Sequence, residues 1–442
     1  MCYTVNMKRK INSQNGKMNK RAARPGPFRV FALTLGIVLL LGLLLIAGTK
    51  VLMKSGKGQE QRQEREEATA ATDNEVQSLW EKVLDEEPEV KETAAVVETS
   101  RYADELADSE YRKANRIYAW EAEKEEEVTI GFVGDILLDD EYAIMANLLR
   151  RGATIDNGIS PALLEKLQGV DILVANNEFP FTDRGTPTEG KTYTFRADTK
   201  AVSYLHDIGV DAAVLANNHI YDFGEVGLLD TLDTLTQAGI PYVGAGRNLQ
   251  EASAPIYYIV NDIKIALVAA TQIERLDNPD TKGATENTAG VFRCLNPEKL
   301  YEVVETAKEN SDFVIVYIHW GTENVTEPDW AQLDQAPKLA QAGADLIIGD
   351  HPHCLQGITY FDDTPVIYSM GNFWFNSRII DTGMVCVTID REGLKSFQFM
   401  PALQSDCRVD LVYDAEKERI LNQMRELSPG VAIDQEGYVS KQ

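Results

Sequence analysis

The sequence is poor in cysteine, in basic residues and in histidine. Five cysteines in 442 residues are too few for a disulfide scaffold or a cysteine-rich zinc module. The 43 Lys and Arg residues stand against 69 Asp and Glu, a net charge of -26, which makes the chain a poor match for nucleic acid. Hydrophobic residues make up 44%, so the chain is not a disordered or collagen-like one. What remains is a large acidic globular protein.

The start of the chain has the opposite charge to the rest. Residues 1–54 hold ten Lys and Arg and no acidic residue, which leaves 33 basic and 69 acidic residues elsewhere. The basic arm precedes one uncharged apolar run, from Val30 to Thr49. As a helix this run is about 30 Å long, the thickness of a bilayer core. A cleaved signal peptide is the alternative, but its apolar core would be shorter.

We therefore predict a basic cytoplasmic arm, residues 1–29, and a transmembrane signal anchor, residues 30–53. The positive-inside rule then places everything after the anchor outside the membrane. Residues 54–127 are rich in acidic residues and poor in β-branched runs, and they predict a charged, partly helical stalk. A partner-binding segment is the alternative for the stalk, although no motif supports it.

From Val128 the pattern becomes that of an α/β domain, which we place at residues 128–405. Short apolar runs alternate with helical stretches, an arrangement typical of a mostly parallel sheet covered by helices on both faces. The runs at 364–373, 383–390 and 394–402 have no helices between them and predict an antiparallel extension or a second sheet. For residues 406–442 we predict a C-terminal helix and tail. The predicted parallel strands are 128–135, 171–178, 211–219, 241–246, 263–272, 312–321 and 344–353, and the predicted helices are 139–150, 225–238, 297–310 and 331–342.

Polar residues gather where these strands end. In open α/β sheets, ligands bind beyond the carboxyl ends of the strands. A single Asp there is usually a helix N-cap and a single Asn a turn residue, but six such ends in one domain indicate a common site. Carboxylate, amide and imidazole groups suit Mn²⁺, Zn²⁺, Fe or Mg²⁺. A purely structural role, or a degenerate site for another ligand, is the alternative. The six ends are Gly134-Asp135, Asn176-Asn177-Glu178, Asn217-Asn218-His219, His319-Trp320-Gly321, Asp350-His351-Pro352-His353 and Gly371-Asn372.

Four stretches in this order and spacing resemble the poly-γ-glutamate capsule-biosynthesis (CapA-type) family, a branch of the calcineurin-like metallophosphoesterase fold. They are LANNHIYDFGEVGLLDTLDTLTQAGIPYVGAGRN, VIVYIHWGTEN, AGADLIIGDHPHCLQGI and VIYSMGNFWFN. The resemblance covers residues 128–376. It implies a layered α-β-β-α sandwich, here preceded by one transmembrane helix and a charged stalk.

The resemblance also implies which residues would bind one or two divalent ions. In the phosphoesterases the first motif typically reads Asp-x-His, whereas here it reads Asp135-Ile136-Leu137, so one ligand is missing. His219 resembles the His that gives a hydrogen bond or proton to the phosphate or leaving group. Glu323, after the His-Trp-Gly motif, is a candidate base or orienting residue. The implied metal ligands are Asp135, Glu178, Asn218, His319, His351 and His353.

Other polar residues are candidates for binding a substrate. Lys191 and Arg196 are suited to an anionic group, with an ordinary exposed loop as the alternative, and Asn177 and Asn372 are further candidates. The pairing of the later cysteines stays open, because four cysteines allow three pairings or four free thiols. These four are Cys294, Cys354, Cys386 and Cys407.

Two functions follow from these observations. The first is a membrane-anchored extracytoplasmic protein that acts in the synthesis, export or anchoring of an anionic envelope polymer of the poly-γ-glutamate type, with polymer-synthase membrane proteins as partners. The alternative is a metal-dependent phosphoesterase or other hydrolase that acts on a cell-envelope substrate, such as a phosphorylated one.

Overall fold

The computed structural model describes residues 100–120, 122, 126–273 and 281–442. They belong to one compact unit, Val90–Gln442. The predicted basic arm, the signal anchor at residues 30–53 and the first part of the stalk lie outside the described residues. Within the part that is described, no helix is both long enough and apolar enough to cross a membrane.

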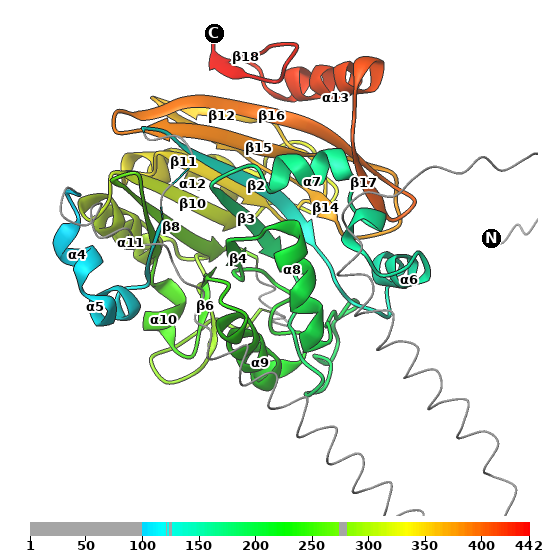
Figure 1. Ribbon diagram of the computed structural model, residues 1–442, viewed down its shortest axis with the longest axis horizontal. Helices are drawn as coiled ribbons and strands as arrows, with labels where there is room; N and C mark the ends of the chain where they lie inside the picture. The colour runs from blue at the N-terminus through cyan, green and yellow to red at the C-terminus, as the bar shows by residue number, and fades with distance from the viewer. Residues whose placement is uncertain (1–99, 121, 123–125, 274–280) are drawn as a thin grey trace, which may run out of the picture. The chain divides into compact units, whose positions relative to one another are not determined.

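Two β-sheets form the centre of this unit (Figure 1). In the first sheet, β7 pairs antiparallel with β8, and β12 pairs antiparallel with β13. The other neighbouring strands run parallel. Its seven strands, in spatial order, are β1 (Ile117–Trp120), β7 (Ile256–Val260), β8 (Ile263–Thr271), β10 (Phe313–His319), β11 (Leu346–Asp350), β13 (Thr364–Ile367) and β12 (Ile358–Phe361).

The second sheet combines a parallel half with an antiparallel half. β2, β3, β4 and β5 are parallel, whereas β15 and β16 form a long antiparallel hairpin beside β2, as the late helix-free runs predicted. A short strand, β14 (Asn372–Trp374), also pairs with β2. This sheet has eight strands: β14 lies off the main path, and the seven strands of the path are, in spatial order, β17 (Arg408–Leu411), β16 (Gly393–Ser405), β15 (Ile380–Asp390), β2 (Val128–Ile136), β3 (Ile172–Asn177), β4 (Ala212–Val214) and β5 (Tyr242–Val243).

Helices cover the outer face of each sheet, which gives the predicted α-β-β-α layers. Buried residues of α6 to α9 pack against the second sheet, and buried residues of α10, α11 and α12 pack against the first. α13 packs against β16 and closes one end of the core between the sheets, as seen at the top of Figure 1. The helices are α6 (Ala143–Arg150), α7 (Pro161–Leu167), α8 (Val202–Ile208), α9 (Gly224–Gln237), α10 (Leu249–Ser253), α11 (Glu298–Glu309), α12 (Trp330–Gln341) and α13 (Asp414–Leu427).

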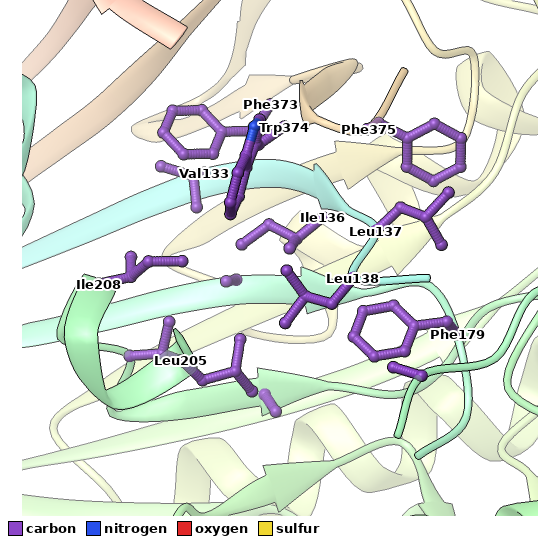
Figure 2. Packing of buried hydrophobic residues seen from close by; sticks show 14 of the residues in the cluster. Val133, Ile136, Leu137, Leu138, Phe179, Leu205, Ile208, Phe373, Trp374 and Phe375 are labelled. Carbon is purple, nitrogen blue, oxygen red and sulfur yellow. The ribbon is translucent and has the colours of Figure 1, made fainter. Parts of the chain in front are cut away.

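Successive side chains of a strand point to opposite faces of its sheet, so each sheet contributes to two hydrophobic cores, one between the sheets and one under its helices. In β10, Phe313, Ile315 and Tyr317 face the space between the sheets, while the residues between them face α11 and α12. Burial on both faces explains why these strands read as continuous apolar runs. Figure 2 shows the core outside the second sheet, where α8 places Leu205 and Ile208 against it.

The folded unit begins earlier than the predicted boundary at Val128. Residues 100–120, which the sequence assigned to the stalk, form α4 (Ala103–Ala107), α5 (Ser109–Ala114) and β1, and β1 pairs with β7. The physical reason is local burial, because Leu106 and Ile117 pack against Ile259. Asp262 also accepts hydrogen bonds from the Ser100 hydroxyl and the Arg101 backbone N–H.

Candidate metal centre

The inward-facing rows of several strands end in polar residues. His319 continues the row of Phe313, Ile315 and Tyr317 on β10, two residues further along. Asp350 continues the row of Leu346 and Ile348 on β11 in the same way. Because side chains alternate along a strand, these groups lie at the carboxyl end of the core between the sheets. The side chains there are almost completely buried.

The first group of side chains surrounds His319 Nε2. This nitrogen lies 2.9 Å from Asn218 Oδ1, 3.2 Å from His351 Nδ1 and 3.4 Å from Glu178 Oε1. A ring nitrogen carries at most one proton, so it can donate to only one of these three atoms. His351 can also donate a proton from Nδ1 to this nitrogen, but in either arrangement at least one of the two oxygens is left without a proton donor in this group. A divalent cation among these four donor atoms would satisfy all of them.

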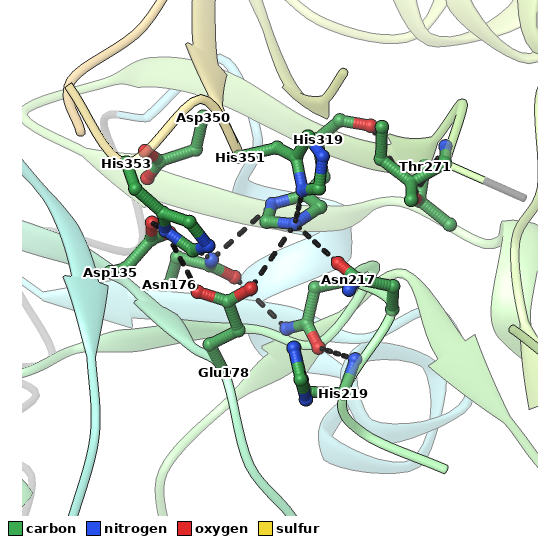
Figure 3. A network of polar contacts seen from close by, with 12 residues as sticks. Asp135, Asn176, Glu178, Asn217, His219, Thr271, His319, Asp350, His351 and His353 are labelled. Atoms are coloured by element: carbon green, nitrogen blue, oxygen red, sulfur yellow. Dashed lines mark hydrogen bonds and ion pairs between the residues drawn. The ribbon is translucent and has the colours of Figure 1, made fainter. Parts of the chain in front are cut away.

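The second group shares Glu178 with the first. Asp135 Oδ2 lies 2.9 Å from His353 Nδ1, and Glu178 Oε2 lies 4.0 Å from that nitrogen. In each group, one ligand atom per residue falls within 4.8 Å of the others. Both oxygens of Glu178 are buried and have no hydrogen-bond partner among the described residues. Glu178 is therefore placed to bridge two neighbouring positions, and its side chain fits a cation on either side (Figure 3).

The histidines of the first group are held neutral. Burial lowers the pKa of His319 to about 3, and burial together with the nearby His319 and His353 lowers the pKa of His351 well below its usual value. A neutral imidazole has the free lone pair that a metal ligand needs. Burial also acts to lower the pKa of His353, but its hydrogen bond to Asp135 and the charge of that carboxylate outweigh burial and raise it.

The carboxyl groups of the site are under strong mutual repulsion. Burial, followed by the charges of Asp135 and Asp350, raises the pKa of Glu178 well above its usual value. Burial would also raise the pKa of Asp135, but the hydrogen bond and charge of His353 outweigh it and lower this pKa. Buried carboxylates of this kind are stable as anions only when positive charge is close by. The donor set thus fits one or more divalent cations.

The backbone around the site is constrained. His351 and His353 have positive φ angles of 99° and 57°, which are uncommon for residues with a side chain and cluster at functional sites. Gly134 lies so close to Gly371, the residue before β14, that a Cβ atom would stand 1.8 Å from Gly371 O. The Asp135 backbone N–H donates to the same carbonyl at 3.0 Å. This close approach fixes Asp135 beside the His351–His353 loop.

Two asparagines to which the sequence gave no role hold the site together. Asn176 Nδ2 donates to Asp135 Oδ1 at 2.7 Å. Asn217 Nδ2 donates to Asn176 Oδ1 at 3.1 Å, and Asn217 Oδ1 accepts from the His219 backbone N–H. The inward position of Asn176, after Ile172 and Val174 on β3, is the signal that would have identified the first of them.

His219 lies beside the metal-ligand groups and is oriented by Asp222. Its Nδ1 is 2.7 Å from Asp222 Oδ2, and its ring stacks on Phe195 at 4.3 Å between centroids. Burial lowers the pKa of His219, although the Asp222 charge opposes this. Lys191 Nζ reaches the other Asp222 oxygen at 2.6 Å.

The four candidate substrate-binding residues occupy different environments. The Lys191 side chain is 5% exposed and ion-paired, so it is not a free receptor for an anion. Arg196 is half-buried, its guanidinium stacks on the Phe223 ring at 4.7 Å, and it makes no ion pair within the described residues. Asn177 and Asn372 are buried at the end of β3 and the start of β14.

Three further predictions have structural outcomes. Glu323 is exposed, and its charge contributes to the raised pKa of His353. Leu137, where a ligand is missing, is buried in the same apolar cluster as Phe375. Within the described residues no disulfide joins any two of the later cysteines, which are Cys294, Cys354, Cys386 and Cys407.

The fold and the site define an α/β protein with two stacked sheets and, at the strand ends, two adjoining groups of His, Asp and Glu that can hold a divalent metal. The comparison with protein families is more specific. Residues 129–377 match the family described as bacterial capsule synthesis protein PGA_cap, and the chain belongs to this family.

Similar proteins bear this out. The PGA biosynthesis protein CapA of Bacillus subtilis (strain 168) is 30% identical over 281 residues, which cover 62% of this chain and 71% of that protein. The capsule biosynthesis protein CapA of Bacillus anthracis is 28% identical over 311 residues, which cover 68% and 73%.

Solved structures show weaker similarity. TT1561 of Thermus thermophilus is 10% identical, with a TM-score of 0.35, over 63% of this chain and 99% of that one. A 5'-nucleotidase from Candida albicans is 11% identical, with a TM-score of 0.34, over 65% and 52%.

Proposed function

We propose that this protein is a membrane-anchored, extracytoplasmic accessory protein that acts in the synthesis, export or anchoring of an anionic polymer of the poly-γ-glutamate type. The observation that carries the proposal is the family match, which spans every strand end that contributes to the candidate metal centre. Relatives from two Bacillus species bear the names of PGA and capsule biosynthesis proteins.

A divalent ion at the candidate centre is part of this proposal. Glu178, Asn218, His319 and His351 would hold one ion, and Asp135 and His353 would face a second position that shares Glu178. The ion would be Mn²⁺, Zn²⁺, Fe or Mg²⁺, since the donors are carboxylates, an amide and imidazoles. When bound, it would offset the buried negative charge and act as a Lewis acid toward an anionic group.

The charge of the chain supports a role for divalent cations. After residue 54 the chain carries 33 basic and 69 acidic residues, so a polyanion would be repelled at low salt. A cation at the site and the Arg196 guanidinium, which has no ion pair among the described residues, would offer positive charge at one face of the domain. Lys191 would not contribute, because Asp222 already holds it.

The anchor at residues 30–53 would keep the domain at the outer surface of the membrane, with the basic arm in the cytoplasm. There it would work with polymer-synthase membrane proteins. Protease treatment of intact cells tests the topology: we expect the domain to be digested from outside and the arm to be protected. Recovery of the chain in the soluble fraction would contradict the anchor.

A gene-replacement experiment tests the function. Cells without the gene should lose surface polymer, and the wild-type gene should restore it. Glu178→Gln, which keeps the shape of the side chain but removes its charge, should not restore it, whereas the matched control Glu302→Gln, at an exposed position on α11, should. Normal surface polymer in cells without the gene would refute the accessory role.

A metal-dependent hydrolase is the second candidate, and the His219–Asp222 pair favours it. With Nδ1–H donated to Asp222, Nε2 would take a proton from the attacking water and pass it to the leaving group, while Asp222 stabilises the positive charge that forms on the ring in between. Turnover of a phosphodiester or a γ-glutamyl amide by the purified protein with Mn²⁺ would test this. We expect His219→Ala to abolish turnover and His206→Ala, on α8, to leave it unchanged; absence of turnover in the wild type would exclude the hydrolase.

A further inference from the structure

Arg378 is an exposed cation to which neither the sequence motifs nor the candidate metal centre gives a role. Its guanidinium makes one hydrogen bond within the described residues, from Nη1 to Asn324 Oδ1 at 3.2 Å, and no ion pair there. A guanidinium has five N–H donors, so most of them are left for a ligand. In a chain with 69 acidic residues against 43 basic ones, a guanidinium without a carboxylate partner is a candidate receptor for an anion.

The loop that carries Arg378 is held in place by a buried glutamine. Gln404, on β16, is fully buried, and its Oε1 accepts hydrogen bonds from the backbone N–H groups of Phe375 and Asn376. Its Nε2 donates to Asn376 Oδ1 at 3.1 Å and to Arg378 O at 3.0 Å. The Arg378 backbone N–H in turn donates to Asn376 Oδ1 at 2.9 Å. A loop fixed in this way before a ligand binds loses less entropy on binding.

This loop borders the candidate metal centre at His353. The Phe375 ring stacks on the His353 ring, with 5.1 Å between centroids. Arg378 follows Phe375 by three residues, so at most about 11 Å of backbone separates them. Asn324, whose side chain accepts the Arg378 hydrogen bond, donates its own backbone N–H to Pro352 O at 2.7 Å. Because Pro352 directly precedes His353, two separate contacts place Arg378 beside this part of the site.

Aromatic rings connect Arg378 with Arg196 on the other side of the site. The Phe195 ring lies edge to face with that of Phe375, at 5.5 Å between centroids, and it stacks on His219 at 4.3 Å. Arg196 is the residue after Phe195, and its guanidinium has no ion pair among the described residues. The two arginines therefore lie one on each side of the two phenyl rings.

We propose that Arg378 binds a carboxylate of an acidic polymer, which lies alongside the metal centre with further carboxylates near Arg196. This inference rests on the proposed function and adds a contact outside the metal centre. An arginine fork binds a carboxylate through two parallel hydrogen bonds, and the repeated carboxylates of a γ-linked glutamate chain can reach both arginines at once. Glu323 is a neighbouring exposed carboxylate, but within the described residues no ion pair joins it to Arg378.

Fluorescence anisotropy of a labelled γ-linked oligoglutamate with the full-length chain, purified in mild detergent with Mn²⁺ present, tests the inference. Arg378→Gln should weaken binding by about tenfold, through the loss of one hydrogen-bonded charge pair. The matched control is Arg391→Gln, which makes the same change of charge at the other end of β15, roughly 35 Å away along the strand, and it should bind like the wild type. Equal affinities of Arg378→Gln and the wild type would overturn the inference.

A second variant separates a ligand contact from a tie between two loops. Asn324→Gly removes the side chain to which the Arg378 guanidinium is bonded, and glycine tolerates the positive φ of 59° at this position. If Arg378 binds the polymer, Asn324→Gly should keep wild-type affinity. If Arg378 only holds the two loops together, Asn324→Gly and Arg378→Gln should lose affinity equally, and that result also overturns the inference.

Competition decides whether the bound group is a carboxylate or a phosphate. Unlabelled γ-linked oligoglutamate should displace the labelled one at a lower concentration than inorganic tripolyphosphate does. Displacement in the reverse order would overturn the assignment to a carboxylate polymer.

The remaining outcomes distinguish this inference from the proposed function. Affinity that is lost in Glu178→Gln and kept in Arg378→Gln would leave the metal centre as the contact with the polymer and remove the role of Arg378. No binding of the oligoglutamate to the wild type would remove the inference, while the gene-replacement experiment would still decide the proposed function.

Discussion

Removal and return of the divalent ion should change the stability of the domain by an amount that can be calculated. An ion that binds only the folded state stabilises it by about 2.7 kcal/mol when its free concentration is a hundred times its Kd. For a unit of the length of Val90–Gln442, unfolding entropies of roughly 2.1 cal/mol/K per residue convert each kcal/mol into about 1.4 °C. One ion should therefore raise the unfolding temperature by about 4 °C, and two ions by about 7 °C.

Glu178→Gln is the perturbation that tests the location of the ions. Glu178 belongs to both ligand groups, and both its oxygens lack partners within the described residues, so its replacement should remove the stabilisation by either ion. Without metal, the variant should be as stable as the wild type or more so, because a buried carboxylate next to Asp135 is gone. Exposed Glu302→Gln on α11 is the matched control.

The assay is differential scanning calorimetry of chelator-treated protein with and without Mn²⁺. We expect the Mn²⁺-dependent rise in the wild type and in the control, and none in Glu178→Gln. An equal rise in Glu178→Gln would place the ions elsewhere and refute the reasoning from the unpartnered oxygens.

Three further predictions concern stability. Lys191→Met leaves Asp222 buried without its cation and should lower the free energy of unfolding in urea by about 3–5 kcal/mol. Burial raises the pKa of Asp211 to about 6, so the free energy of unfolding should fall as the pH rises from about 4 to 6 and should stay at the lower value above pH 6. Asp211→Asn should abolish this pH dependence and should be more stable than the wild type at pH 7 by on the order of 2–3 kcal/mol. Gly134→Ala should destabilise the protein by more than about 3 kcal/mol, because its Cβ would stand 1.8 Å from Gly371 O and β14 would have to move.

Each of these predictions has a result that would contradict it. Lys338→Met, at an exposed ion pair, should lower the free energy of unfolding by less than about 1 kcal/mol. An equal effect of Lys191→Met would mean that the buried ion pair stabilises the fold no more than the exposed one. An Asp211→Asn stability profile that parallels that of the wild type between pH 4 and 6 would exclude Asp211 as the titrating group. A Gly134→Ala protein with wild-type stability would show that β2 and β14 separate easily.

The strands and the convergence of their ends could be predicted from the sequence pattern, whereas the layering as two stacked sheets was implied only by the family resemblance. Continuous apolar runs such as that of β10 indicate strands buried on both faces, and motif spacing places Asp135, Glu178 and the histidines at their ends. These ends belong to two stacked sheets, and they meet at the carboxyl end of the core between the sheets.

Other features depend on tertiary contacts that no local pattern records. The involvement of β1 rests on Ile117 packing against Ile259, and the burial of Lys191 rests on the fold of its loop over Asp222. Charge alone made Lys191 a candidate for binding an anion. The inward position of Asp350 could have been predicted, since it lies two residues beyond Ile348 on the inward row of β11. Only the adjacent histidines were predicted to belong to the site.

An anomalous-scattering experiment at the manganese absorption edge, on crystals of the protein grown with Mn²⁺, tests the metal centre most directly. We expect one peak among Glu178, Asn218, His319 and His351 and a second beside Asp135 and His353. Mn²⁺-saturated crystals with no peak within about 3 Å of these donor atoms, beyond direct coordination distance, would contradict it.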